Sequence, residues 1–173
     1  MNYTFIKNLI ILTGFQITWL SCFFGEYYHL HLVGVFVGIA YLIIFFICIK
    51  NKMQSFKICS FISIIGYFFD TTLAYFDLYI FKSSILFGFL PLWFLILWPC
   101  FATLFVSTFY FLKNKIFLSF FLGATLGPLT YYSGIYVEIV YSTNIYLTFS
   151  LMIIFWGTFL SSYSRIIDKF IKE

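Results

Sequence analysis

Six long apolar runs, separated by short polar segments, dominate the pattern of the chain. A helix needs about 20 mostly apolar residues to cross the hydrocarbon core of a bilayer. The pattern predicts six membrane-spanning helices, over residues 5–24, 30–49, 58–79, 90–112, 116–139 and 144–165. Residues 42–47 are apolar at every position, which argues against the alternating pattern of a transmembrane β-strand. We therefore expect an all-α fold, a bundle of six transmembrane helices.

The connecting segments are short, so we expect a single transmembrane domain over residues 1–173. Cytoplasmic loops of membrane proteins carry an excess of Lys and Arg. If both termini are cytoplasmic, only Lys82 of the ten basic residues falls on the outer side. The others are Lys7, Lys50, Lys52, Lys57, Lys113, Lys115, Arg165, Lys169 and Lys172. This asymmetry predicts that both termini are cytoplasmic.

The composition supports a lipid environment and excludes two other classes of protein. Only 9% of the residues are charged and 63% are apolar, whereas a soluble domain carries about 25% charged residues. A soluble protein of this size could not bury so much apolar surface, and a disordered chain would be far more polar. The net charge of +4 comes from scattered residues rather than from a dense basic patch, so no nucleic acid is expected as a partner.

One ionisable residue, Asp70, falls deep inside a predicted span. It lies twelve residues after Ile58, which is roughly 18 Å along a helix. A carboxylate is expensive in lipid, so a carboxyl at this depth is a functional hypothesis by default. The structural alternative is a neutral, protonated carboxyl, hydrogen bonded to Gln16 or to a tyrosine hydroxyl, because burial disfavours the charged form. Both interpretations stay open at this point.

Other unusual residues are predicted near the level of Asp70 or slightly further out. Singly, each has a structural explanation: tryptophans form interfacial belts, and a glutamine can hydrogen bond between helices. Their shared depth predicts a ligand-binding set that comprises Asp70, Gln16, Trp19, Trp93, Trp98, Tyr131, Tyr132 and Ser133.

Prolines and glycines modify this predicted layer. Pro99 and Pro128 lie inside predicted spans, where each should kink its helix and free a backbone carbonyl. In lipid a freed carbonyl needs a partner within the protein, which favours a small polar cavity there. The pairs Gly34/Gly38 and Gly123/Gly127 are spaced four residues apart and predict close helix packing.

Known catalytic and metal-binding patterns find little support. Glu26, His29 and His31 share one short loop and could supply metal ligands, but no second cluster joins them, so neither a metal nor a cofactor is predicted. Both histidines lie at the surface, away from any serine at membrane depth. Asp70 and Asp77 are about 10.5 Å apart on one helix, so they cannot form an aspartyl dyad. No catalytic residue is assigned, and an enzyme is the less favoured class.

Three motifs in the predicted helices resemble a known family. They are Asn8 with Phe15-Gln16-x-x-Trp19-x-x-Cys22, Pro91-Leu92-Trp93 with Leu97-Trp98 and Phe101-Ala102, and Gly127-Pro128-Leu129-x-Tyr131-Tyr132-x-Gly134. Together they resemble a bacterial family of small six-helix inner-membrane proteins that is catalogued only as a domain of unknown function. The family's third helix carries an aspartate like Asp70, whereas Glu138 stands where the family often has a small residue. The resemblance implies a multi-pass protein of the bacterial inner membrane, hints at a lipid role and gives no reaction.

Three functions remain open from the sequence. The favoured one is binding or transport of a small or lipid-like ligand in a polar pocket around Asp70, in the outer half of the membrane. The second is an intramembrane lipid-modifying enzyme in which Asp70 is a general base. The third is a ligand-free structural or assembly partner of another membrane protein, with Asp70 paired to that protein. The lipid bilayer is the partner that the composition demands, and no protein partner is assigned.

Overall fold

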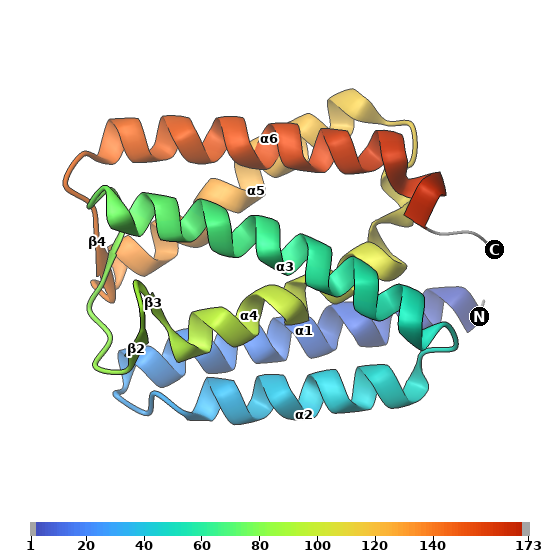
Figure 1. The fold of residues 1–173 in the computed structure, drawn as a ribbon, viewed down its shortest axis with the longest axis horizontal. Helices are drawn as coiled ribbons and strands as arrows, with labels where there is room; N and C mark the ends of the chain where they lie inside the picture. The colour runs from blue at the N-terminus through green and yellow to red at the C-terminus, as the bar shows by residue number, and fades with distance from the viewer. Residues whose placement is uncertain (1–2, 171–173) are drawn as a thin grey trace. The chain divides into compact units, whose positions relative to one another are not determined.

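The computed structural model describes the backbone of residues 3–170 and the side chains of residues 5–167, and helices make up most of it (Figure 1). The α-helices are α1 (Tyr3–Tyr27), α2 (Val33–Cys48), α3 (Lys52–Tyr75), α4 (Leu92–Ala102), α5 (Ile116–Tyr136) and α6 (Ile145–Phe170). Two 3-10 helices, η1 (Thr103–Val106) and η2 (Thr108–Leu112), follow α4. Four two-residue strands, β1 (Ile80–Phe81), β2 (Leu86–Phe87), β3 (Leu90–Pro91) and β4 (Val140–Tyr141), complete the list. The all-α expectation is confirmed.

Four of the described helical segments are long and apolar enough to cross a membrane. They are Phe5–Tyr27, Lys52–Tyr75, Ile116–Tyr136 and Ile145–Ile167. Two further apolar segments, Val33–Cys48 and Leu92–Val106, are shorter. Helix α2 has 16 residues, or about 24 Å, against the roughly 30 Å of a bilayer core. The orientation inferred from the basic residues stays a prediction, and of those residues Lys172 lies outside the described part and the side chain of Lys169 is not described.

The helix predicted over residues 90–112 differs from the observed structure. The α-helix ends at Ala102 and continues as η1 and η2, with Ser107 between them in a non-helical conformation (φ −150°, ψ −43°). The Cys100 carbonyl accepts hydrogen bonds from both the amide and the hydroxyl of Thr103. A bond over three residues tightens the chain into a 3-10 turn, which explains the change at this point.

Three helices end in the same way, and this sets boundaries that hydropathy did not predict. Each of α1, α3 and α5 is followed by a residue with positive φ: His29 (60°), Asp77 (56°) and Glu138 (62°). In each case this residue and the apolar residue after it donate amide hydrogen bonds back to the last turn. This is the Schellman arrangement, in which the left-handed position is usually glycine. Helices α3 and α5 therefore stop at Tyr75 and Tyr136, before the predicted ends at residues 79 and 139.

The described chain divides into two compact units. The first contains the described residues up to Thr71 together with Ser83–Phe109, and so includes α1, α2, most of α3, the β2/β3 hairpin and α4. The second contains Thr72–Lys82 and the described residues from Tyr110 onward, and so includes β1, α5, β4 and α6. The single domain predicted over residues 1–173 stays a prediction.

In the first unit, small residues let α2 lie close to its neighbours. A Cβ atom at Gly34 would overlap the backbone of Cys22 on α1, and one at Gly38 would press on Ile96 of α4. The Tyr41 hydroxyl of α2 lies 3.1 Å from the Ile11 carbonyl oxygen of α1 and 2.6 Å from the Thr103 hydroxyl. The predicted packing face of Gly34 and Gly38 is confirmed.

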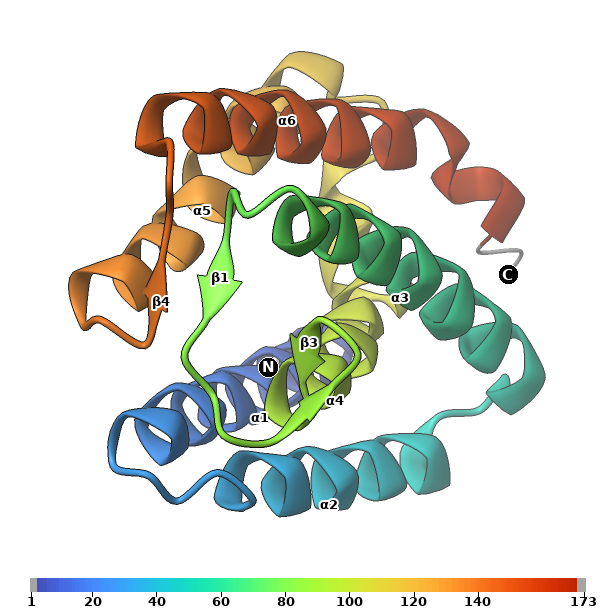
Figure 2. The same cartoon turned by 60° about the vertical axis from the view of Figure 1, so that its left-hand side comes forward.

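In the second unit, α5 packs directly on α6. A Cβ atom at Gly123 would overlap the Trp156 carbonyl group, and one at Gly127 would overlap the Trp156 indole. The strands β1 and β4 pair antiparallel beside these helices, with Ile80 opposite Tyr141 (Figure 2). The predicted packing face of Gly123 and Gly127 is therefore confirmed as well.

Candidate functional site

Asp70 occupies a position on the buried face of α3. The buried residues Ile62, Gly66, Asp70 and Leu73 recur every three or four residues, which is the spacing of one helix face. Asp70 is 1% exposed, so its carboxyl lies among residues that would otherwise form an apolar core. Burying a polar group at such a position is costly unless it is hydrogen bonded.

An indole N–H donates a hydrogen bond to this carboxyl. Trp98 Nε1 of α4 donates to Asp70 Oδ2 at 2.5 Å, and Trp98 is itself 4% exposed. Gly66 lies one turn before Asp70, and any side chain there would overlap the fused rings of Trp98. Gly66 therefore leaves the space in which the indole rests, and Asp70 lies at the edge where its N–H emerges. All three residues belong to the first unit.

Trp98 is one of the residues predicted around Asp70 that the structure brings directly to it. Trp98 contacts Asp70, whereas Gln16, considered as a hydrogen-bond partner, is exposed on α1 next to the buried Phe15. Trp93 is buried, and its carbonyl oxygen accepts a hydrogen bond from the Cys22 thiol at 3.7 Å. Trp19 is half-buried and stacks on Phe23, with ring centroids 5.4 Å apart. A part for Gln16, Trp19 and Trp93 in ligand binding stays a prediction.

The remaining predicted residues lie on α5, in the second unit. Tyr131 is buried, and its carbonyl oxygen accepts a hydrogen bond from the Tyr79 hydroxyl at 3.1 Å. Tyr132 is 47% exposed, and the Ser133 hydroxyl donates to the Thr130 carbonyl at 2.6 Å. Three consecutive helical residues point in three directions about 100° apart. The role of these three residues in ligand binding stays a prediction.

Sequence reasoning missed a second contact between α3 and α4. The Tyr67 hydroxyl donates to the Leu95 carbonyl oxygen at 2.5 Å. Leu95 is four residues before Pro99, so its carbonyl is the one that loses its helical donor because proline has no N–H. The available signal was this spacing: a carbonyl freed by proline in an apolar helix requires a donor from a neighbouring helix.

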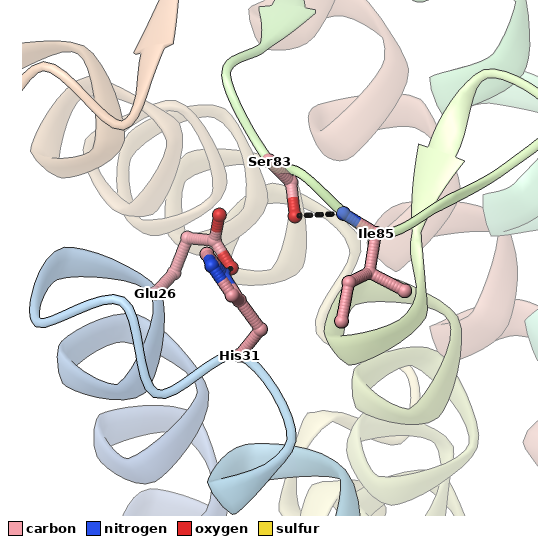
Figure 3. A network of polar contacts seen from close by, with 4 residues as sticks. All are labelled: Glu26, His31, Ser83 and Ile85. Carbon is pink, nitrogen blue, oxygen red and sulfur yellow. Dashed lines mark hydrogen bonds and ion pairs between the residues drawn. The ribbon is translucent and has the colours of Figure 1, made fainter.

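Glu26 and His31 form a second polar contact in the first unit, at the end of α1 (Figure 3). His31 Nδ1 lies 2.8 Å from Glu26 Oε2, and Glu26 is 5% exposed. The Ser83 hydroxyl, on the loop drawn beside them, accepts a hydrogen bond from the Ile85 amide at 3.5 Å. Among the residues that the structure describes, no three His, Cys, Asp or Glu side chains are grouped so as to hold a metal ion. Glu26 and His31 are therefore paired with each other, and His29 is exposed next to them.

Comparison with known proteins places the chain in one family. The model of a family described as "Protein of unknown function (DUF2878)" matches residues 8–162. No curated protein matches the chain. No solved structure matches it.

Proposed function

The chain belongs to the DUF2878 family, and we propose that it is a membrane-embedded protein that binds or transports a small or lipid-like ligand, with Asp70 as its protonatable group. The observation that carries the proposal is a carboxyl that is 1% exposed, on a helix long and apolar enough to cross a membrane. A side chain of this cost, at this position, is a functional site by default in a membrane protein.

The partner of Asp70 supports a role in which the carboxyl changes its protonation state. An indole N–H can only donate a hydrogen bond. Asp70 Oδ2 accepts that bond from Trp98, and it can do so in both forms of the carboxyl, because the proton of the neutral form can sit on Oδ1. The contact therefore tolerates gain or loss of a proton, which a binding or transport cycle of this kind requires.

Burial also favours this proposal over the assembly alternative. If Asp70 paired with another membrane protein, its carboxyl would need to reach the surface of this chain. Instead it is buried and accepts a hydrogen bond from Trp98. The proposal keeps the predicted orientation, with both termini in the cytoplasm of a bacterium, the chain in the inner membrane and the ligand entering from the outer half of the bilayer. The asymmetry of the basic residues supports that orientation.

Native mass spectrometry of the protein purified in mild detergent tests the proposal. We expect the wild type to carry a bound mass that Asp70→Asn lacks, while folding is preserved because the amide oxygen can still accept from Trp98. Asp77→Asn is the matched control: Asp77 is exposed, and asparagine tolerates its positive φ. It should bind as the wild type does. If Asp70→Leu keeps the same bound mass and unfolds at a higher temperature, Asp70 is a packing residue and the proposal is wrong.

A further inference from the structure

Two of the side-chain contacts between α3 and the turn of α4 before Pro99 are hydrogen bonds. One is the hydrogen bond from Trp98 to Asp70, and the other is the hydrogen bond from Tyr67 to the Leu95 carbonyl. Leu95 and Trp98 are three residues apart, so they lie on the same face of α4. On α3, Tyr67 and Asp70 are likewise three residues apart. Two neighbouring positions of one helix therefore hold two neighbouring positions of the other.

The Tyr67 contact replaces a bond that the chain cannot make within α4. In a regular helix the amide of residue 99 would donate to the carbonyl of residue 95. Pro99 has no amide hydrogen, and a buried carbonyl without a donor is unfavourable in an apolar environment. The Tyr67 hydroxyl supplies the donor that the Leu95 carbonyl lacks within α4.

We infer that Tyr67 is a positioning residue of the Asp70 site: by donating to the Leu95 carbonyl it fixes the proline-interrupted turn of α4, and so fixes where the Trp98 indole meets Asp70. The importance of this positioning for ligand binding rests on the proposed function of Asp70. The geometry itself concerns two hydrogen bonds of the first unit.

The physical link is the direction of the indole N–H. A hydrogen bond weakens steeply once the donor points away from the acceptor. A helix turn that lacks one backbone bond can bend or rotate more freely than an intact one. If the Leu95 carbonyl were released, that turn would move, and Trp98 with it. The indole N–H would then lose its alignment with Asp70.

The test is a two-by-two comparison of Tyr67→Phe and Pro99→Ala, observed through the indole N–H resonance of Trp98 in the 15N-labelled protein. The resonance is assigned with Trp98→Phe. We expect a downfield resonance in the wild type, as for an N–H that donates to a carboxyl, and a clear upfield displacement in Tyr67→Phe. Alanine at position 99 restores the amide donor to Leu95. In the Pro99→Ala background, Tyr67→Phe should therefore leave the resonance almost unmoved.

A matched control separates this effect from the general loss of a buried hydroxyl. Tyr41→Phe removes a hydroxyl of the same unit that contacts Ile11 and Thr103, away from Leu95. It should not displace the Trp98 resonance in either background. If the Trp98 resonance does not move in Tyr67→Phe, Tyr67 has no positioning role and the inference is overturned. If Tyr67→Phe displaces the resonance equally with and without Pro99, the displacement comes from packing and the inference is likewise overturned.

A second measurement keeps the test decisive if Pro99→Ala fails to fold. The 13C shift of the Leu95 carbonyl reports its hydrogen bond directly, and it needs only the wild type and Tyr67→Phe. We expect the shift to change when the hydroxyl is removed, and an unchanged shift contradicts the inference. Neither readout requires a ligand. Failure here would therefore leave the proposed function standing, while failure of the ligand-binding test would leave the positioning role of Tyr67 intact.

Discussion

The helix pairs α3/α4 and α5/α6 both place an indole against a glycine of the neighbouring helix, yet they pack differently. Trp98 of α4 lies over Gly66, and Trp156 of α6 lies over Gly127. In α5/α6 a second glycine, Gly123, meets the backbone of α6, so the two backbones touch along much of their length. The backbones of α3 and α4 approach each other at far fewer places, and side chains span the space between them.

The residue one turn after each glycine shows what this difference allows. After Gly127 the chain has Tyr131, whose ring meets the Trp156 ring with centroids 6.2 Å apart. After Gly66 it has Asp70, which accepts the indole hydrogen bond of Trp98. The same arrangement thus holds an aromatic contact in one pair and a buried carboxyl in the other. The wider spacing of α3 and α4, bridged by polar side chains, is why this helix pair holds the candidate functional site.

We expect the greatest loss of stability when the space under each indole is filled. In an exposed helix, replacing glycine with alanine gains about 1 kcal/mol. In Gly66→Ala and Gly127→Ala the new Cβ atom overlaps a buried indole, and overpacking of this kind typically costs about 1–3 kcal/mol. We expect thermal unfolding in detergent to show both variants destabilised. Only Gly66→Ala should also displace the Trp98 indole resonance and lose the bound mass. A Gly66→Ala variant as stable as the wild type would show that the indole does not rest on Gly66.

Replacing each tryptophan with phenylalanine isolates the hydrogen bond to Asp70, because both changes remove a similar apolar area. Trp98→Phe also removes the donor to Asp70, and leaving a buried acceptor without that donor costs about 1–3 kcal/mol more. We expect unfolding free energies to show a larger loss for Trp98→Phe than for Trp156→Phe. In an Asp70→Leu background the extra loss should vanish. If the extra loss of Trp98→Phe persists in the Asp70→Leu background, it is due to packing, and the hydrogen bond contributes little to stability.

The sequence predicted the presence of the helices, and a shared depth for Asp70 and Trp98, better than it predicted which side chains face inward. Apolar length is visible in the sequence, and it located six α-helices, of which four are long and apolar enough to cross a membrane. Glycine spacing is visible as well, and the close packing that it predicts was confirmed. The face that a residue occupies was not visible, because a helix that is apolar all round has no periodic pattern to define its inner side. Gln16 illustrates this: it is exposed although its neighbour Phe15 is buried.

Two further features depend on tertiary contacts and could not be inferred from local pattern. Tyr67 looked like one of many aromatic residues, and only its contact with the carbonyl freed by Pro99 distinguishes it. Glu26 was considered only as a possible metal ligand on a short loop, whereas the structure buries it against His31. In both cases a polar group is satisfied by a residue distant along the chain or across a turn, and hydropathy contains no information about such a partner.

The ends of α3 and α5 are the places where the two helix pairs are most alike, and we expect substitutions there to change stability only slightly. Asp77 and Glu138 each lie eleven residues after the glycine under the indole, and both have positive φ. A left-handed conformation costs roughly 1–2 kcal/mol for most residues, but aspartate adopts it more readily. We therefore expect Glu138→Gly to stabilise the protein by about 0.5–1 kcal/mol, since the flexibility of glycine in the unfolded chain offsets part of the gain. Asp77→Gly should stabilise it less.

Two control variants decide the origin of that gain in thermal unfolding. Gly88 also has positive φ, and no atom lies within 4 Å of the Cβ position there, so Gly88→Ala should destabilise through the backbone alone. Glu138→Gln keeps the backbone cost and removes only the charge, which lies unfavourably at a helix C-terminus. If Glu138→Gln reproduces the whole gain of Glu138→Gly, the charge rather than the backbone conformation is responsible. The positive φ that Asp77 and Glu138 have in common would then not be what lowers stability at the end of α5.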